Sequence, residues 1–420
     1  MSNSQHLYYD DSFLKTFTAK VDAVRESDGG EGRWRVALDR SAFYPTSGGQ
    51  PFDRGVLIPI AQGEAGQGIE VEDVSEGEDG TVWHTVRVQV AAGTRVEGRI
   101  DWERRFDHMQ QHTGQHLLSA VFWSELKAHT VSFHLGEESA TIDLSIAPPS
   151  AADLQRVERI ANEIIAEDRP VSVRMATRED AEAMLAAGEL RKLPEREGSL
   201  RVVEIADCDL NACGGTHVRS TGQIGSILLR KIEKVSRGVR VEFLCGLRAV
   251  RRARAEAEVL AEAGALLSVG VAELAGAIGR VQAESKSAGR EIQKLRGELA
   301  VLEAAKLVAE TPVENGVRLL VRSWKDKDRE FVKLLASRTA AAAPGTAVVF
   351  FAEEADPFRV LVGRSGDLGF NCGQFVREEL AKIGLRGGGS ADMAQGDVPA
   401  EKAEELRTSI VEAIRGACNV

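Results

Sequence analysis

The stretch Arg105-Phe-Asp-His-Met-Gln-Gln-His112-Thr-Gly-Gln-His116-Leu-Leu118 decides how the centre of this chain of 420 residues folds. Apolar residues at helical spacing continue through Phe122, so the sequence predicts a helix over residues 102–127 with one apolar face. His112 and His116 are four residues apart and therefore lie one turn apart on the same face of that helix. Both imidazoles can reach one ion there, and such a pair is half of a zinc site.

A second pair of donors with the same spacing occurs in Cys213-Gly-Gly-Thr-His217. Its Gly-Gly turn allows a tight loop that brings a thiolate and a third imidazole to the same metal. Other readings stay open, because a histidine at helical spacing is more often a surface or core residue and structural zinc sites more often use C-x2-C. Thr113 stands where H-E-x-x-H has its glutamate, which argues against a zincin-type protease.

Length and composition predict two or three domains with real apolar cores. No apolar run reaches membrane-spanning length, and the N-terminal residues have no charged start followed by an apolar stretch. We therefore expect no signal peptide, no membrane association and a cytoplasmic location. The five cysteines are scattered and odd in number, which argues against a disulfide framework and leaves Cys213 available as a ligand.

The chain divides by pattern into four parts of an α+β multidomain protein. Alternating apolar and polar residues predict a small β-barrel-like domain over residues 1–100, and mixed strands and helices predict an α+β domain with the zinc site over residues 101–248. Residues 249–312 lack proline before residue 312 and read as a long helix. Residues 313–420 alternate short strands with helices, which predicts a C-terminal α/β domain.

The long helix carries a heptad seam from Val271 to Leu302, in which apolar residues recur three and four positions apart with two small or polar interruptions. A coiled-coil contact or a helical hairpin follows from this pattern, and we expect the segment to support a homodimer. Glycines weaken the helix, and a break near Ser268-Val-Gly270 would divide it into two.

Two loops and one basic segment are further candidates for function. The stretch Phe43-Tyr-Pro-Thr-Ser-Gly-Gly-Gln-Pro-Phe-Asp-Arg-Gly55 cannot be a helix or a central strand, and ordered loops of this kind often carry function. The run Gly387–Gly396 could offer backbone N–H groups to a phosphate or ribose. The segment from Arg219 to Arg254 contains ten basic residues and only two acidic ones, Glu233 and Glu242. This excess predicts a basic strip that faces phosphates, although the net charge of the chain is −11. An ordinary turn, a linker and a solvated hairpin are the plain alternatives.

The helical stretch 105–118 and the loop Asp209-Leu-Asn-Ala-Cys-Gly-Gly-Thr-His-Val218 closely resemble the editing domain of alanyl-tRNA synthetases and its free-standing AlaX relatives. The loop at residues 44–55, Arg191-Lys-Leu-Pro194 and Arg240-Val-Glu-Phe243 match as well. The C-terminal part is similar to the last domain of alanyl-tRNA synthetase. Almost the whole chain therefore resembles the long form of AlaX, although Asp107-His108-Met109 is not the signature of DHH phosphoesterases.

The resemblance implies a zinc-dependent aminoacyl-tRNA deacylase that works without ATP, because no aminoacylation domain precedes the editing part. Its substrate would be tRNA for alanine that carries serine or glycine, with the acceptor stem on the basic strip and the elbow on the C-terminal domain. The alternative is a non-catalytic zinc protein that binds tRNA or supports assembly.

The residues expected to carry this function fall into three sets. One zinc ion per chain would bind to His112, His116, Cys213 and His217. A pocket that accepts serine must hydrogen-bond its hydroxyl, and the candidates are Thr46, Ser47 and Gln115. The candidates for tRNA contact are Arg219, Arg230, Lys231, Lys234, Arg237, Arg240, Gly387, Gly388, Gly389 and Gln395.

Overall fold

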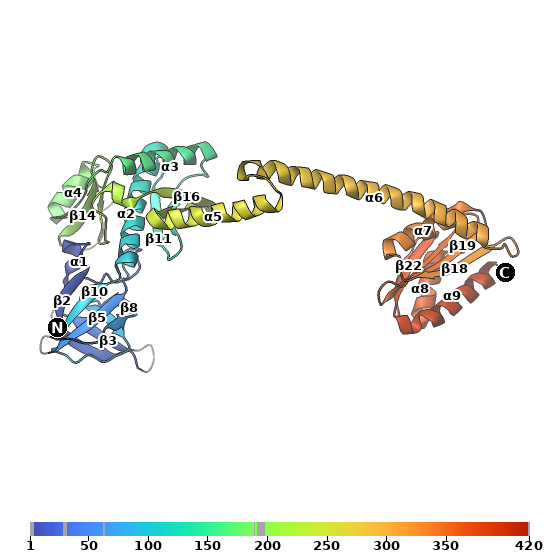
Figure 1. The fold of residues 1–420 in the computed structure, drawn as a ribbon, viewed down its shortest axis with the longest axis horizontal. Coiled ribbons are helices and arrows are strands. Elements are labelled where there is room, and N and C mark those ends of the chain that lie inside the picture. Colours follow the sequence, from blue (N-terminus) through green and yellow to red (C-terminus); the bar gives the residue numbers. More distant parts are fainter. Residues whose placement is uncertain (1–3, 28–31, 62–63, 189, 191–197, 419–420) are drawn as a thin grey trace. The chain divides into compact units, whose positions relative to one another are not determined.

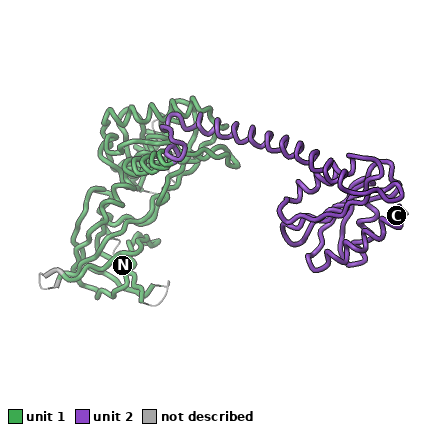
Figure 2. The backbone as a smooth tube through the Cα atoms, turned by 45° about the vertical axis from the view of Figure 1, so that its right-hand side comes forward, with its two compact units in different colours: residues 1–262 green, residues 263–420 purple. Residues whose placement is uncertain are grey.

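The computed structural model describes residues 4–27, 32–61, 64–188, 190 and 198–418 (Figure 1). The Arg191-Lys-Leu-Pro194 stretch lies outside these residues. The chain forms two compact units, residues 1–262 and residues 263–420 (Figure 2). Each unit has its own apolar core.

The first unit begins with a near-closed barrel, as the alternating pattern predicted. Its strands follow the order β6-β5-β10-β2-β3-β9-β8, and β7 pairs with β5 beside this path. The bounds are β2 (Thr16–Glu26), β3 (Trp34–Leu38), β5 (Gly55–Ala61), β6 (Glu64–Ala65), β7 (Ile69–Val71), β8 (Asp73–Glu76), β9 (Val82–Val86) and β10 (Arg95–Ile100). Before and beside the barrel lie β1 (Gln5–His6), α1 (Leu7–Asp10) and β4 (Arg40–Ser41). Alternate side chains of these strands meet inside the barrel, and Val36, Leu57 and Val96 are fully buried there.

The α+β part of the first unit is built around helix α2 (Trp102–Leu126). Asp101 caps its N-terminus by accepting from the Arg104 N–H, and Lys127 ends it in a left-handed conformation. A four-stranded sheet in the order β11-β12-β17-β16 and a three-stranded sheet in the order β13-β14-β15 pack with it. These strands are β11 (Thr130–Leu135), β12 (Ala140–Leu144), β13 (Val171–Ala176), β14 (Leu200–Ile205), β15 (Asp209–Ala212), β16 (Ile227–Val235) and β17 (Gly238–Cys245).

Helix α2 is buried all round along its central part, from His108 to Phe122. Its polar residues in this stretch therefore face other parts of the protein rather than water, and most of their polar atoms find hydrogen-bond partners there. Gly114 permits the close approach of β17, since a Cβ at this position would lie 2.3 Å from Cys245 Sγ. Around α2 lie α3 (Ala151–Ala166), the short η1 (Thr221–Ile224) and the start of α5 (Gly246–Leu266), while α4 (Arg178–Ala186) packs beside β13.

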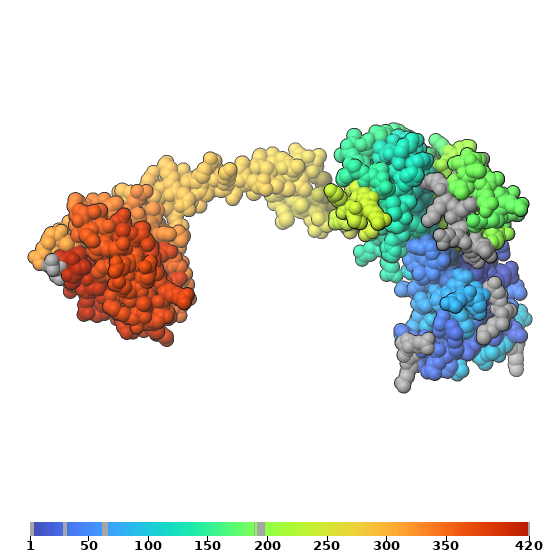
Figure 3. All heavy atoms as spheres, turned by 180° about the vertical axis from the view of Figure 1, so that it is seen from behind, coloured from blue at the N-terminus to red at the C-terminus, as the bar shows by residue number. Residues whose placement is uncertain are grey.

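The predicted break in the long helical segment is present. Helix α5 ends at Leu266, Ser268 adopts a left-handed conformation, and η2 (Val271–Glu273) leads into α6 (Leu274–Glu310) of 37 residues. The first part of α6 projects from the rest of the second unit, as Figure 3 shows. Most of the predicted seam is exposed in the described chain, and Ile292 is 54% exposed. No single helix of the described residues is long and apolar enough to cross a bilayer, and only the bent pair α5 and η2–α6 passes that test jointly.

The C-terminal module of the second unit is a mixed sheet in the order β18-β19-β20-β22-β21, with helices on both faces. Strand β19 supplies both cores, because Val349 faces α8 and α9 while Val348 and Phe350 face α6 and α7. The elements are β18 (Arg318–Trp324), α7 (Arg329–Ala342), β19 (Thr346–Ala352), β20 (Phe358–Arg364), α8 (Cys372–Lys382), β21 (Gly387–Gly389), β22 (Met393–Val398), η3 (Ala400–Lys402) and α9 (Ala403–Cys418).

The Gly387–Gly396 run forms two paired strands at the edge of the sheet, which corrects its prediction as a loop. Gly387–Gly389 is strand β21 and pairs with β22. A Cβ at Gly387 or Gly396 would lie 2.3 or 2.2 Å from Leu380 Cδ1, so these glycines let helix α8 pack directly on the strands. The glycine-rich composition of this run predicted a loop because strands rarely contain so many glycines.

Candidate metal centre

The two donor pairs predicted from their spacing meet at one point. Helix α2 holds His112 and His116, and the loop that follows β15 holds Cys213 and His217. One ligand atom of each residue lies within 4.8 Å of the others. Cys213 Sγ is 3.3 Å from His112 Nε2 and 3.3 Å from His217 Nε2. Three nitrogens and one sulfur in such a cluster form the donor set of a tetrahedral zinc site.

The other ring nitrogen of each histidine has a polar neighbour on the outside of the cluster. His112 Nδ1 lies 2.9 Å from Gln50 Oε1, and His217 Nδ1 lies 3.1 Å from Thr113 Oγ1. His116 Nδ1 is 3.3 Å from Asp209 Oδ2, within ion-pair distance but without the alignment of a hydrogen bond. A proton on each Nδ1 leaves the Nε2 lone pair for a metal. The arrangement therefore fits a metal ion held through three Nε2 atoms and one thiolate.

The electrostatics of the cluster favour metal binding as well. Burial raises the pKa of the Cys213 thiol, but the His112, His217 and His116 imidazoles together outweigh burial and hold that pKa well below its ordinary value. Burial lowers the pKa of His217 to about 3, so its imidazole is neutral near pH 7. A thiolate and neutral imidazoles are the protonation states that bind zinc.

The ligand loop is shaped by its glycines and by a buried arginine. A Cβ at Gly215 would lie 2.1 Å from His112 Cε1, so no other residue fits there without displacing that ligand. Arg201 Nη1 donates to the carbonyl oxygens of Cys213, at 2.9 Å, and Gly215, at 2.7 Å. The Gly215 N–H donates to Cys213 Sγ at 3.4 Å. These contacts hold the loop against α2 with its two ligands directed at the histidines.

The proline-glycine loop of the barrel reaches the metal centre through Gln50. This side chain is fully buried; its amide oxygen accepts from the Thr216 N–H at 3.1 Å, and its amide nitrogen donates to Thr216 Oγ1 at 2.9 Å. Gln50 thus joins the ligand loop to His112 of α2. Nothing in the sequence singled it out within its loop, because its role depends on two segments that are distant along the chain.

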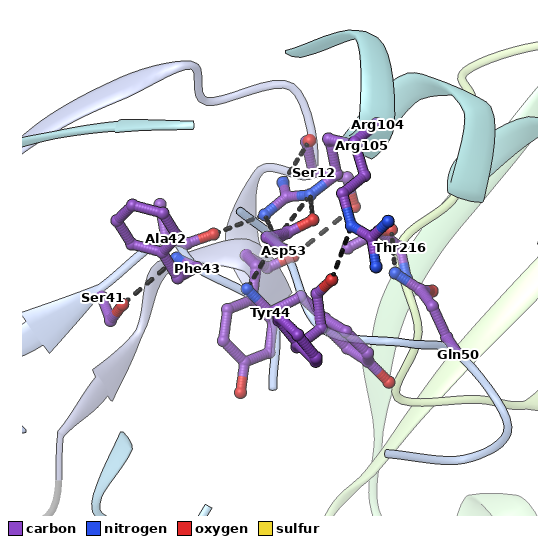
Figure 4. Close-up of polar contacts among 12 residues, drawn as sticks. Ser12, Ser41, Ala42, Phe43, Tyr44, Gln50, Asp53, Arg104, Arg105 and Thr216 are labelled. Atoms are coloured by element: carbon purple, nitrogen blue, oxygen red, sulfur yellow. Dashed lines mark hydrogen bonds and ion pairs between the residues drawn. The ribbon is translucent and has the colours of Figure 1, made fainter. Parts of the chain in front are cut away.

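A buried ion pair fixes the base of the same loop to α2 (Figure 4). Arg105 and Asp53 are both fully buried, and Arg105 Nε lies 3.0 Å from each carboxylate oxygen of Asp53. Arg105 also donates to the carbonyl oxygens of Ser12 and Ala42, and Asp53 accepts from the Tyr44 N–H at 2.6 Å. Because every polar group of the pair is satisfied, it sets the position of the loop relative to the helix.

A cavity of about 550 Å³ opens beside the metal ligands His116 and Cys213. Gln115 lines it and is 6% exposed; its Nε2 donates to Ser119 Oγ at 2.9 Å, while its amide oxygen has no hydrogen-bond partner among the described residues. Asn211 and Thr130 also line the cavity. An unpartnered buried acceptor costs free energy, which a donor group brought to it would recover.

Thr46 and Ser47, unlike Gln115, do not line the cavity. Both side chains are exposed, and the cavity touches their loop only at Gly48. The Ser47 and Gln50 backbones pair across a tight turn in which Gly48 and Gly49 have positive φ. This turn directs Gln50 inward and leaves Thr46 and Ser47 outside.

Most residues of the predicted basic strip have an acidic partner. Lys234, Arg237 and Arg254 are its members without an ion-pair partner among the described residues. The sequence did not reveal these pairs because most of the acids come from distant segments. The ion pairs are Arg219–Asp11, Arg230–Glu256, Lys231–Glu233, Arg240–Asp143, Arg248–Asp107, Arg251–Glu103 and Arg252–Glu256.

The predicted tRNA-contacting residues of the C-terminal module lie on its two last strands. Gly387, Gly388 and Gly389 form β21, and Gln395 lies on β22 opposite Gly388. The amide oxygen of Gln395 is buried without a hydrogen-bond partner in the described structure.

Comparison with known proteins agrees with this architecture. The chain is 30% identical over 434 residues to the alanyl-tRNA editing protein AlaX-L of Pyrococcus horikoshii, and the match covers 99% of this chain and all of that protein. The chain belongs to the AlaX-L family. Residues 200–241 match the second additional domain of threonyl- and alanyl-tRNA synthetases, residues 316–416 match the DHHA1 domain, and residues 2–104 match class II (A) tRNA synthetases.

Alanine–tRNA ligases are similar to this chain along one part of their own length. The ligase of Pyrococcus abyssi is 34% identical over 426 residues, which are 98% of this chain and 44% of the ligase. The ligase of Methanothrix thermoacetophila is 35% identical, with coverage of 94% and 42%. The chain thus spans less than half the length of these ligases.

Proposed function

We propose that the protein hydrolyses the ester bond between a wrong amino acid and tRNA for alanine, with serine as the main target and glycine as the second. The observation that carries the proposal is the cavity in which the ligands His116 and Cys213 share a wall with Gln115. Such a cavity brings an ester next to a metal centre and to polar groups that can select the amino acid. Membership of the AlaX-L family supports the same reaction.

His112, His116, Cys213 and His217 would hold a zinc ion. With one of the four ligands displaced, the ion would polarise a carbonyl or a water molecule as a Lewis acid, and with all four bound it would position the substrate. The side chains around the site orient its ligands. Asp209, Gln50 and Thr113 hold the three imidazoles in one orientation. The low polarity of the buried surroundings strengthens each of these electrostatic contacts.

Gln115 is the residue that we propose for the choice between serine and alanine. Its unpartnered amide oxygen can accept from the hydroxyl of a seryl group, whereas an alanyl group leaves that buried oxygen without a partner. Sites that hydrogen-bond a substrate hydroxyl reject the analogue without it by up to roughly 10⁴ or more. The amide of Gln115 is kept in place by Ser119.

We further propose which parts of the chain contact tRNA and where the protein is located. Lys234 and Arg237, which have no ion-pair partner among the described residues, lie at the turn between β16 and β17 and are proposed to contact the acceptor stem. The C-terminal module, which matches the DHHA1 domain, is proposed to bind the tRNA elbow. We place the protein in the cytoplasm, where Cys213 stays reduced and can bind metal.

Incubation with seryl-tRNA and alanyl-tRNA for alanine tests the proposal. We expect the zinc-loaded protein to release serine and to spare alanine, and we expect His116→Ala to lose the activity together with the metal. His134→Ala is the matched control, because His134 is an exposed histidine of β11 outside the cavity. Stable seryl-tRNA in the presence of the zinc-loaded wild type would leave the non-catalytic tRNA-binding protein as the remaining reading.

A further inference from the structure

The cavity beside the metal centre is larger than an amino acid requires. Its volume of about 550 Å³ falls in the range of roughly 300–1,000 Å³ typical of sites for drug-sized ligands. The ligands His116 and Cys213 and the amide of Gln115 occupy part of its wall. The remaining wall must therefore face another part of the substrate.

Two aromatic rings, Trp123 and His129, belong to that remaining wall. Their ring centroids are 4.3 Å apart and their planes meet at 39°. Trp123 is half-buried in the last turn of α2, and His129 is exposed just before β11. Lys127 ends the helix with a positive φ, and this sharp turn brings His129 back onto Trp123.

A cation accompanies the ring pair. Lys127 Nζ lies 5.6 Å from the centroid of the Trp123 ring, and Lys127 has no ion-pair partner among the residues that the structure describes. An exposed ring next to a free ammonium group is the combination that binds single-stranded nucleic acid, in which bases stack on aromatic side chains and basic groups meet the backbone.

We propose that Trp123 and His129 form the subsite for the terminal adenine of the tRNA, with Lys127 beside it for the adjoining phosphate. This rests on the proposed function, because the ester to be cleaved joins the amino acid to the ribose of that terminal adenosine. An ester placed at the metal centre leaves its adenine within the same cavity. A base on the face of His129 adds a third ring to this tilted pair.

Binding of two RNA hairpins to the full-length, zinc-loaded protein tests the subsite. Both carry the same labelled acceptor stem; one ends in single-stranded CCA, and the other has a terminal ribose without its base. By fluorescence anisotropy, the wild type should bind the first hairpin about 5- to 150-fold more tightly, the range that one base–aromatic stack produces. His129→Ala should reduce this ratio to near one, and His129→Phe should keep it.

Controls separate stacking from folding and from the proposed function. His134→Ala removes an exposed histidine outside the cavity and should keep the ratio. Equal binding of both hairpins by the wild type, or an unchanged ratio in His129→Ala, would overturn the subsite. Hydrolysis of seryl-tRNA is measured in parallel: hydrolysis without adenine discrimination rejects the subsite alone, and discrimination without hydrolysis rejects the proposed function alone.

Discussion

Gln50 Oε1 lies 2.9 Å from Nδ1 of the metal-ligand candidate His112, although the two residues belong to a barrel loop and to helix α2. The same oxygen accepts from the N–H of Thr216, which directly precedes the ligand His217. One buried amide therefore aligns both ligand segments. This relationship makes the barrel a part of the metal centre rather than a separate domain beside it.

Replacement of Gln50 should weaken metal binding. Gln50→Ala removes the acceptor that fixes the His112 tautomer, and the loss of such an outer contact typically costs 10- to 100-fold in metal affinity. Competition with a chelator measures the zinc affinity directly. Ser47→Ala, at an exposed position of the same loop, should leave the affinity unchanged. Equal zinc affinity of wild type and Gln50→Ala would show that His112 needs no such support.

Removal of the buried carboxylate at Asp53 should destabilise the first unit. Asp53→Ala leaves the Arg105 guanidinium buried without its counter-charge, which costs about 3–5 kcal/mol. Urea denaturation followed by a signal from the first unit measures the free energy of unfolding. Glu97→Gln breaks a half-exposed pair with Arg99 in the same barrel and should cost at most about 1 kcal/mol. Similar values for the two variants would contradict the role of the buried pair.

His84 should make the stability of the barrel depend on pH. Burial lowers its pKa to about 4, while its Nδ1 donates to the Val36 carbonyl and its Nε2 accepts from the Ser41 hydroxyl. Between pH 6.5 and pH 4 the unfolded chain binds a proton that the folded chain does not, so stability falls as the pH falls through this window. The total loss is ~3 kcal/mol. Below pH 4 both states are protonated, and the contribution becomes constant.

The contribution of His84 is measured as a difference between two proteins. His84→Gln loses hydrogen bonds and should be less stable at pH 7, but its unfolding free energy should change less between pH 6.5 and pH 4 than that of the wild type. Other titrating groups cancel in the comparison. Parallel pH profiles for both proteins would rule out this assignment.

Removal of the residues after 310 should weaken tRNA binding and spare the metal centre. All four ligand candidates lie in the first unit, and the DHHA1-like module lies in the second. Zinc affinity of the truncated chain should match that of the full chain, whereas its affinity for tRNA should fall. Unchanged tRNA affinity would refute a role for the C-terminal module.

The apolar seam of helix α6 should pair with a second copy of the chain. Ile292, Leu295 and Leu299 recur at heptad spacing and remain 54%, 53% and 46% exposed. Their burial in a coiled coil removes apolar surface from water. Sedimentation velocity should show a dimer that dissociates on dilution. Leu295→Glu should give a monomer, while Lys286→Glu, outside the seam, should not; a monomeric wild type at every concentration would contradict the pairing.

Local patterns in the sequence determined the elements and the ligands themselves. The spacing of His112 and His116 required only a helix, and the Gly-Gly turn between Cys213 and His217 required only a tight loop. Alternation predicted the barrel for the same reason. Each of these features depends on residues that are neighbours in the chain, so the periods of helix and strand were sufficient.

The tertiary structure alone decided which distant residues support the site. Gln50 rather than Thr46 or Ser47 faces the metal ligands because a two-glycine turn rotates the loop, and Asp53 finds Arg105 across the barrel boundary. The basic strip contains only two acidic residues, and folding brought acidic partners from other segments to most of its members. Hydrogen bonds and ion pairs act over a few ångströms in space, and the sequence does not state which segments come that close.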